Sequence, residues 1–384
     1  MADTYINNFT NKSLELCNGS LVVSDCLWRI ILSCFMTLFM LMSCIGNGAV
    51  LLVLRYHHDD IKSASNYFIT NLALTDFLLG VLCMPCILIS CLNGQWVFGQ
   101  NLCSLTGFAN SFFCINSMIT LAAVSVEKYC AIASPLTYHH YMSKSKVTCV
   151  ISIIWIHSAI NASLPFLGWG EYVYLPFETI CTVAWWSFPN YVGFIVGINF
   201  GLPTVIMSCT YFLVLKIARK HSRRIGVSTS TVAISTYLSP TGTYNNLSPV
   251  NVTTSDHQET LPLPCDTDLG ILTSNSISQR IRLQYVREML TSRRIHYKTH
   301  IKATLMLLIV IGSFIVCWLP HLISMVYLTI YEISPLPCSF HQITTWLAMA
   351  NSAFNPIIYG AMDTSIRKGL KTLLGSWVKY CKLY

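Results

Sequence analysis

The chain has 384 residues, of which 53% are hydrophobic and only 10% are charged, and its mean hydropathy is +0.54. A soluble domain carries about 25% charged residues, so no single aqueous fold could bury this much apolar surface. The bilayer must therefore be the solvent for most of the chain. The formal net charge of +8 is then a matter of membrane topology and does not indicate a nucleic-acid partner.

Seven apolar segments are long enough to cross a bilayer, which takes about 20 residues of helix. They are Ile30–Leu54, Tyr67–Leu92, Leu102–Val126, Val147–Trp169, Tyr191–Leu215, Ala303–Val326 and Cys338–Met362. One of them contains an acid, Asp76, and none contains Lys or Arg. We therefore predict an all-α membrane protein whose residues 30–362 form a bundle of seven transmembrane helices.

The distribution of basic residues predicts the orientation. Lys12 and Arg29 precede the first segment, and every other Lys or Arg lies after segment one, three, five or seven. By the positive-inside rule the N-terminus is outside and the C-terminus is cytoplasmic, with the plasma membrane as the expected location.

Residues 1–29 form the expected extracellular N-terminus. They contain acids and no apolar run, so we expect no cleavable signal peptide and an insertion signal in the first segment. Glycosylation sequons begin at Asn8, Asn11 and Asn18, on the predicted outer face. We expect all three to be glycosylated.

The third segment organises the rest of the chain. Cys103 and Lys128 stand 25 residues apart, so a helix places them roughly 37 Å apart, at opposite water interfaces. Thr106, Asn110 and Ser117 recur at spacings of four and seven and form one polar stripe. Such a stripe should face protein or a wet cavity rather than lipid.

Several cysteines lie on the predicted outer face, where an oxidising compartment permits disulfides. Cys103 and Cys181 are placed so that a disulfide would pin the loop after segment four over the mouth of the bundle. Cys17, Cys26 and Cys338 are also outside, and their connectivity stays open.

Two cytoplasmic stretches have distinct compositions. Ile225 to Gln279 contains no Lys or Arg and is rich in Ser, Thr and Asn, which predicts a disordered third cytoplasmic loop at 225–279. Residues 363–384 should begin with a short amphipathic helix, with Asp363 as its N-cap. Near the end, Cys381 is either palmitoylated or a plain thiol.

Short motifs occur in order through all seven segments. They are Gly46-Asn47, Leu72 to Asp76, Trp96 to Gly99, Cys103, Glu127-Lys128-Tyr129, Pro135-Leu136, Trp155, Pro165, Pro203 with Tyr211, Phe314 to Pro320, and Asn355 to Tyr359. Together, from about Gly46 to Leu374, they resemble the rhodopsin-like (class A) G-protein-coupled receptors. Trp155 to Trp185 and Thr344 to Leu347 look most similar to a small group of orphan receptors within that class.

The resemblance implies a sodium pocket at mid-membrane. In the family, the residues at these positions line a hydrated pocket that binds a sodium ion: Asp76, Ser117, Asn351, Ser352 and Asn355. Converging oxygen ligands suit a hard cation. The alternative is a protonated or water-bridged structural aspartate. Sodium, as an allosteric ligand, is the one ion that we consider; we expect no cofactor.

The resemblance also implies a coupling surface at the cytoplasmic end. The residues concerned are Glu127, Lys128, Tyr129, Leu136, Tyr211 and Tyr359. Lys128 departs from the family, which has arginine there, and a compact ammonium does not replace a planar guanidinium. We hypothesise a weak resting latch and raised basal signalling; the alternative is that Lys128 impairs coupling.

The ligand pocket implied by the resemblance lies at the outer end and comprises Asn110, Cys114, Trp318, His321, Trp346 and Met349. Asn110 stands where amine receptors have an aspartate, and Met349 stands where opsins have the retinal lysine. A monoamine and retinal are therefore both disfavoured. The aromatic loop from Gly170 to Pro189 either forms part of the interfacial belt or is a lid that plugs the pocket.

We expect a receptor that passes an extracellular stimulus, or its own basal activity, to heterotrimeric G proteins by population shift. Membrane lipids, arrestin and receptor kinases are further expected partners. The chain has no phosphate-binding loop and no nucleophile elbow, so we expect no enzyme. The alternatives are a receptor-like protein that does not couple to G proteins because of Lys128 and, less favoured, a transporter. The sequence does not predict the ligand, the G-protein subtype or the oligomeric state.

Overall fold

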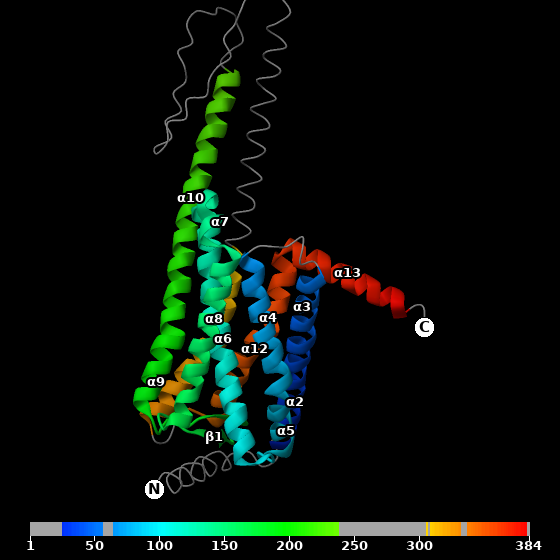
Figure 1. Cartoon of the computed structure of the whole chain (residues 1–384), viewed down its shortest axis with the longest axis vertical. Helices are drawn as coiled ribbons and strands as arrows, with labels where there is room; N and C mark the ends of the chain where they lie inside the picture. The colour runs from blue at the N-terminus through cyan, green and yellow to red at the C-terminus, as the bar shows by residue number, and fades with distance from the viewer. Residues whose placement is uncertain (1–24, 57–63, 238–304, 306–307, 332–335, 382–384) are drawn as a thin grey trace, which may run out of the picture. The chain divides into compact units, whose positions relative to one another are not determined.

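The computed structural model describes residues 25–56, 64–237, 305, 308–331 and 336–381. These residues are helical almost throughout and include one antiparallel sheet of two strands, as Figure 1 shows. Contacts divide the chain into two units, Met1–Leu215 with Lys302–Tyr384, and Lys216–Ile301. The first unit contains the helical bundle.

The first four spans are assembled from consecutive helical pieces. The first is α2 (Asp25–Leu41), the π-helix η1 (Met42–Gly46) and α3 (Asn47–Tyr56); the second is α4 (Ala64–Leu82) with α5 (Met84–Asn93). The third is the single helix α6 (Gly99–Ala133), and the fourth is α8 (Lys144–Ser163) with the 3-10 helix η2 (Leu164–Leu167). The short helix α7 (Pro135–Tyr141) connects α6 to α8.

The remaining elements complete the bundle. A hairpin of β1 (Tyr172–Leu175) and β2 (Ile180–Val183) leads to α9 (Pro189–Ile195), the π-helix η3 (Val196–Gly201) and α10 (Leu202–Tyr237). The sixth span is the helix at Leu308–Ile330. The seventh is α12 (Cys338–Met362), followed by α13 (Thr364–Cys381).

Among the described residues, six helices are long and apolar enough to cross a membrane by length and composition. The seventh predicted segment coincides with α12, which begins and ends at the predicted residues. Its sequence carries His341, Gln342, Asn351 and Asn355, which lower its hydropathy. All seven predicted segments therefore contain a helix, with non-helical residues at Cys83 and at Gly168-Trp169.

Burial follows the logic of a bundle in lipid rather than in water. Along the first span Leu38, Ile45 and Leu52 are 49%, 67% and 49% exposed, so apolar side chains cover the outside of the bundle. Asn47 and Asp76 are 0% exposed. Because lipid offers no hydrogen bonds, polar side chains gain by turning inward toward one another.

Close helix packing requires glycine at Gly46. A Cβ atom there would lie 2.9 Å from Cγ of Pro356 on α12, so only a residue without a side chain fits. Gly46 also ends the π-helix η1, where Ser43 donates a hydrogen bond to the backbone carbonyl of Asp76 at 2.8 Å. The first span is thereby held against both the second and the seventh.

The prediction of disorder from residue 225 is wrong at its start. The helix α10 continues to Tyr237, into the second unit, and the rest of the predicted disordered segment lies outside the described residues. Extending an existing helix fixes one residue for each new hydrogen bond, so a polar stretch of modest helix propensity can continue it. The sequons at Asn8, Asn11 and Asn18 also lie outside the described residues.

The amphipathic helix after the seventh span begins as the sequence predicts. Asp363 accepts a hydrogen bond from the backbone N–H of Ile366 at 3.1 Å, which is an N-cap contact. Ile366 is fully buried, whereas Leu374 is 65% exposed. Cys381 is the last residue of α13.

Candidate functional site

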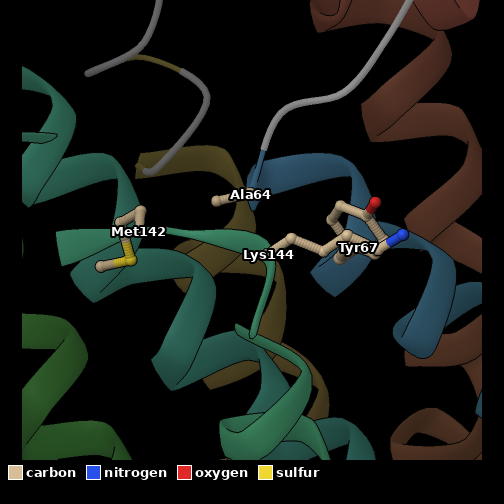
Figure 2. A pocket seen from close by; sticks show the side chains of 4 residues that line it. All are labelled: Ala64, Tyr67, Met142 and Lys144. Atoms are coloured by element: carbon tan, nitrogen blue, oxygen red, sulfur yellow. The ribbon is translucent and has the colours of Figure 1, made fainter. Parts of the chain in front are cut away.

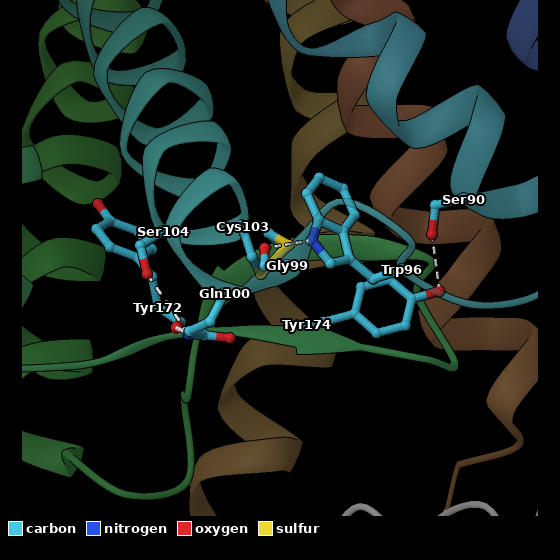
Figure 3. Close-up of a disulfide and its surroundings, with 9 residues drawn as sticks. Ser90, Trp96, Gly99, Gln100, Cys103, Ser104, Tyr172 and Tyr174 are labelled. Carbon is cyan, nitrogen blue, oxygen red and sulfur yellow. Dashed lines mark hydrogen bonds between the residues drawn. A yellow bond between two sulfur atoms is a disulfide. The ribbon is translucent and has the colours of Figure 1, made fainter.

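A disulfide fixes the hairpin to the third span. Cys103, near the start of α6, is bonded to Cys181 on β2, with their Cα atoms 5.3 Å apart (Figure 3). Tyr174 on β1 accepts a hydrogen bond from Ser90 of α5 at 2.9 Å. The pairing that the sequence permitted is therefore confirmed. Cys338 is also disulfide-bonded, and Cys17 lies outside the described residues.

Tyr172 sets how closely the hairpin approaches α6. Its backbone carbonyl accepts a hydrogen bond from Gln100 at 2.9 Å (Figure 3), and its hydroxyl donates to the carbonyl of Ala162 at 2.9 Å. A Cβ atom on Gly107 would lie 2.6 Å from the Tyr172 ring, so the glycine lets the ring pack on the helix. Burial raises the pKa of Tyr172, which keeps its hydroxyl a donor.

The turn of the hairpin is buried in the outer end of the bundle. Glu178 is 0% exposed, and its backbone carbonyl accepts a hydrogen bond from the Trp346 indole of α12 at 3.2 Å. Ile180 belongs to the same apolar cluster as Trp346 and Met349. The adjacent Thr179 has φ +58°, a left-handed conformation that a β-branched residue rarely adopts. The structure thus favours the lid over the interfacial belt for this part of the loop.

Two histidines connect the sixth and seventh spans beneath the hairpin. His341 Nδ1 is hydrogen-bonded with Ser324 Oγ at 2.5 Å, and His321 Nδ1 is hydrogen-bonded with Thr345 Oγ1 at 3.2 Å. Both histidines therefore make polar contacts between the two spans near the hairpin.

Four of the six predicted ligand-pocket residues, Cys114, Trp318, Trp346 and Met349, lie in or against two apolar clusters. Trp318 packs against Phe200 of η3, with ring centroids 5.1 Å apart, and its ring lies 6.1 Å from that of His321. Cys114 contacts both clusters and approaches the Asn110 side-chain oxygen at 3.8 Å. The hairpin therefore packs against residues of the predicted ligand pocket.

Asp76 is the centre of a polar site at mid-bundle. Its carboxylate accepts hydrogen bonds from Ser117 Oγ at 3.0 Å and from Asn355 Nδ2 at 2.7 Å. The Ser352 side chain also lies within hydrogen-bonding reach of it. The Ser117 hydroxyl is also hydrogen-bonded with the Thr75 hydroxyl, 3.0 Å away. This site joins α4, α6 and α12 through one carboxylate.

The residues around Asp76 fit a small hard cation. Oxygen atoms of a carboxylate, a hydroxyl and amides are the ligands such an ion prefers. Asn351 is buried, and its side-chain oxygen has no hydrogen-bond partner among the described residues, so an acceptor is left to be satisfied. The predicted sodium pocket remains a prediction that this donor set supports.

The C-terminal end of α6 carries a compact ionic cluster. Tyr138 of α7 donates a hydrogen bond to Glu127 Oε1 at 2.5 Å, and Lys128 Nζ lies 3.4 Å from Glu127 Oε2. Lys128 also donates to Ser65 Oγ of α4 at 2.5 Å. Burial and then the neighbouring Glu127 raise the pKa of Tyr138, so it remains a donor.

The structure also describes the four other predicted coupling residues. Tyr359 is fully buried, and its hydroxyl has no hydrogen-bond partner among the described residues. Tyr211 packs against the same apolar cluster, and Tyr129 is half-buried. Leu136 lies in the first turn of α7.

A hollow of about 320 Å³ lies beside this cluster (Figure 2). Ala64 and Tyr67 of α4, Met142 and Lys144 line it. The Lys144 ammonium lies 5.9 Å from the centre of the Tyr67 ring, a cation–π arrangement.

Over residues 46–359 the sequence matches the family described as 7 transmembrane receptor (rhodopsin family), which covers most of the chain. The chain belongs to this family. The receptor is 26% identical to G-protein coupled receptor 161 of Homo sapiens over 365 residues, 95% of this chain and 61% of that protein. It is 27% identical to the alpha-1A adrenergic receptor of Oryzias latipes over 346 residues, 90% of this chain and 67% of that protein.

A solved structure shares the fold. The crystal structure of squid rhodopsin superposes with a TM-score of 0.68 over 92% of this receptor and 87% of that chain, at 19% identity. The receptor spans between 54% and 61% of the length of the G-protein coupled receptor 161 proteins of human, mouse and cattle. It is a multi-pass membrane protein with the seven-helix fold predicted from its sequence.

Sequence reasoning missed three residues of the outer site. Thr345 and Ser324 are the partners of the two histidines, and Ile180 fills the apolar cluster around Trp346. Glu178 lies in the aromatic loop from Gly170 to Pro189, whose composition does not indicate that this side chain is buried. The one available signal in the sequence was that Glu178 and Ile180 lie within three residues of Cys181. A disulfide from Cys181 to α6 must bring its neighbours in the chain close to the bundle.

Proposed function

We propose that the receptor activates heterotrimeric G proteins without a diffusible ligand, because its own hairpin occupies the outer end of the bundle. The observation that carries the proposal is the burial of Glu178 and Ile180 against Trp346, inside the predicted ligand pocket. A loop held there by a disulfide acts at very high effective concentration. The relatives named above as G-protein coupled support the partner class.

We further propose that the N-terminus is extracellular and the C-terminus cytoplasmic. Disulfides persist in oxidising compartments, so the end of the bundle that carries the Cys103–Cys181 bond suits the outside. On this basis we keep the proposed boundaries, an extracellular part at 1–29, a bundle at 30–362 and a cytoplasmic part at 363–384. The proposed cytoplasmic partners are the G protein, arrestin, receptor kinases and anionic lipids. The Lys144 ammonium in the lining of the hollow supports the last of these, because it would attract an anionic headgroup.

Lys128 decides between two readings of the cytoplasmic end. Its ammonium is held by Glu127 and Ser65, and its side chain is 19% exposed. If this arrangement is only a weak latch, the receptor signals in its basal state. If it replaces an arginine that the G protein requires, the receptor is silent. The second candidate function is therefore a receptor-like protein that does not couple to G proteins, and the Lys128 contacts are the observation that favours it.

A panel of G-protein activation sensors, run without added ligand, tests the proposal. The samples are cells expressing the native receptor, Lys128→Arg or an empty vector, with surface expression matched by an N-terminal tag. We expect the native receptor to exceed the empty vector in at least one pathway. A silent native receptor with an active Lys128→Arg variant would mean that Lys128 impairs coupling. Silence of both in every pathway would refute G-protein signalling.

A further inference from the structure

We propose that the turn of the hairpin is a proton-binding site, with the Glu178 carboxyl as the acceptor and the extracellular proton as the stimulus that sets basal signalling. The inference rests on the proposed function, because it names a ligand for the same outer site. A proton needs no cavity, so it is compatible with a pocket already filled by the hairpin.

The surroundings of Glu178 disfavour its ionised form. The side chain is 0% exposed, and neither carboxyl oxygen has a hydrogen-bond partner among the described residues. The Thr345 hydroxyl lies close enough to act on the carboxyl, but it is shared with His321 Nδ1 at 3.2 Å. An ionised carboxylate in such a place has lost its water without gaining a strong partner.

The position of Glu178 links its protonation to the signalling helices. Its backbone carbonyl is held by Trp346 of α12, and Thr345 lies next to Trp346 on the same helix. Thr345 contacts His321 of the sixth span, whose ring lies 6.1 Å from that of Trp318. A change of charge at Glu178 therefore acts directly on contacts between the sixth and seventh spans.

The elements packed around the hairpin carry other titratable groups. They are His321 on the helix at Leu308–Ile330, His341 and Cys338 on α12, Cys114 on α6, Arg29 on α2, and Glu171, Tyr172 and Tyr174 in the loop itself. Cys338 is in a disulfide, and Arg29 lies close enough to act on Tyr174. Histidine ordinarily titrates near physiological pH, so the experiment must separate the effect of His321 and His341 from that of Glu178.

The direction of the pH effect follows from the burial. Burial raises the pKa of Glu178 from 4.5 to about 8, partly opposed by the Thr345 hydroxyl. The inserted hairpin thus binds the proton more tightly than a withdrawn, solvated one. Proton binding therefore stabilises the inserted hairpin fully below pH 4.5, the pKa of Glu178 in water. This stabilisation is lost as the pH rises through about 8, the pKa of the buried Glu178. Within that window the ratio of inserted to withdrawn hairpin falls roughly tenfold for each pH unit.

The first test measures basal signalling of the full-length receptor in cells at external pH 6.5 and 8.0. We expect the native signal to be about twofold or more higher at pH 6.5. Glu178→Gln, which imitates the protonated carboxyl, should give the acid-level signal at both pH values. Glu171→Gln changes the other carboxyl of the loop and should keep the native pH response. The proposal is overturned if Glu178→Gln retains the native pH response, or if His341→Gln, which lies outside the contacts from Glu178 through Thr345 to His321, abolishes it.

The second test needs no G protein. The thermal unfolding midpoint of purified receptor is followed from pH 6.5 to 8.5, where the native protein should lose more stability than Glu178→Gln. Thr345→Val removes the hydroxyl that partly opposes the rise in the pKa of Glu178. The pH at which this variant loses stability should therefore lie above that of the native receptor, and this comparison can be made even if Glu178→Gln fails to fold. Silent sensors together with a pH-dependent midpoint that maps to Glu178 would refute the proposed signalling and leave proton binding standing. Equal pH profiles for all variants would overturn the proton site whatever the sensors report.

Discussion

Replacing Trp155 with phenylalanine should destabilise the bundle through a single lost hydrogen bond. The Trp155 indole donates to Asn71 Oδ1 at 2.7 Å, and the Asn71 amide donates to Asn116 and Thr120 at 3.0 and 2.8 Å. Asn71 is 5% exposed, so the variant leaves its acceptor without a partner in a place that lipid cannot satisfy. That costs about 1–3 kcal/mol. At about 2 °C per kcal/mol the unfolding midpoint should fall by about 2–6 °C.

A thiol-reactive dye on detergent-purified receptor measures this change. Cys83, Cys91 and Cys317 are buried and react only when the bundle opens, whereas exposed cysteines give a constant background. Trp169→Phe is the matched control, since its side chain is 40% exposed at the bundle surface. The control midpoint should move by less than about 1 °C.

The reasoning is tested most sharply by a double-mutant cycle. In an Asn71→Ala background there is no acceptor left for the Trp155 indole, so Trp155→Phe should cost little there. If Trp155→Phe lowers the midpoint equally in both backgrounds, the loss arises from ring packing against Phe112 rather than from the hydrogen bond. That result would refute the argument from an unsatisfied acceptor.

Three further changes test other parts of the molecule by the same thermal assay. Replacing choline by sodium should raise the native midpoint by about 2 °C, equivalent to about 1 kcal/mol, and leave Asp76→Asn unmoved; an equal response would exclude the sodium pocket. Gly46→Ala should cost about 1–3 kcal/mol because its Cβ would lie 2.9 Å from Pro356, whereas Gly48→Ala, with 3.5 Å to its nearest neighbour, should be tolerated. Asp363→Ala should weaken the start of α13 by about 1 kcal/mol, seen as faster amide hydrogen exchange there, and Asp363→Asn should not.

Features written into local sequence were predictable. The long apolar runs gave the spans, because a helix is the way an isolated segment satisfies its backbone in lipid. α12 matches its predicted bounds, and Asp363 caps α13 because its short carboxylate reaches the free N–H groups of the first turn. The continuation of α10 to Tyr237 was missed because composition predicts disorder without accounting for the helix that precedes it.

Features that depend on tertiary placement were not predictable. Lys128 contacts Ser65, which is 63 residues away in sequence, and no local pattern indicates that contact. The burial of Glu178 depends on the register of the hairpin, in which Tyr174 pairs with Cys181, and on the disulfide that fixes this register against α6. An aromatic loop with two acids has the same composition whether it lies at the lipid interface or plugs the bundle.

The sixth span is the part of the bundle best suited to move. Among the described residues, every hydrogen bond that it makes to another element lies in its outer half, at His321, Ser324 and Thr329. Its inner half, around Val310 and Phe314, is held by apolar packing. Hydrogen bonds fix both position and direction, whereas apolar contacts can be exchanged for similar ones at modest cost. A change at the hairpin is thus applied where this helix is held firmly, and a small rotation there becomes a larger displacement at the opposite end of the helix.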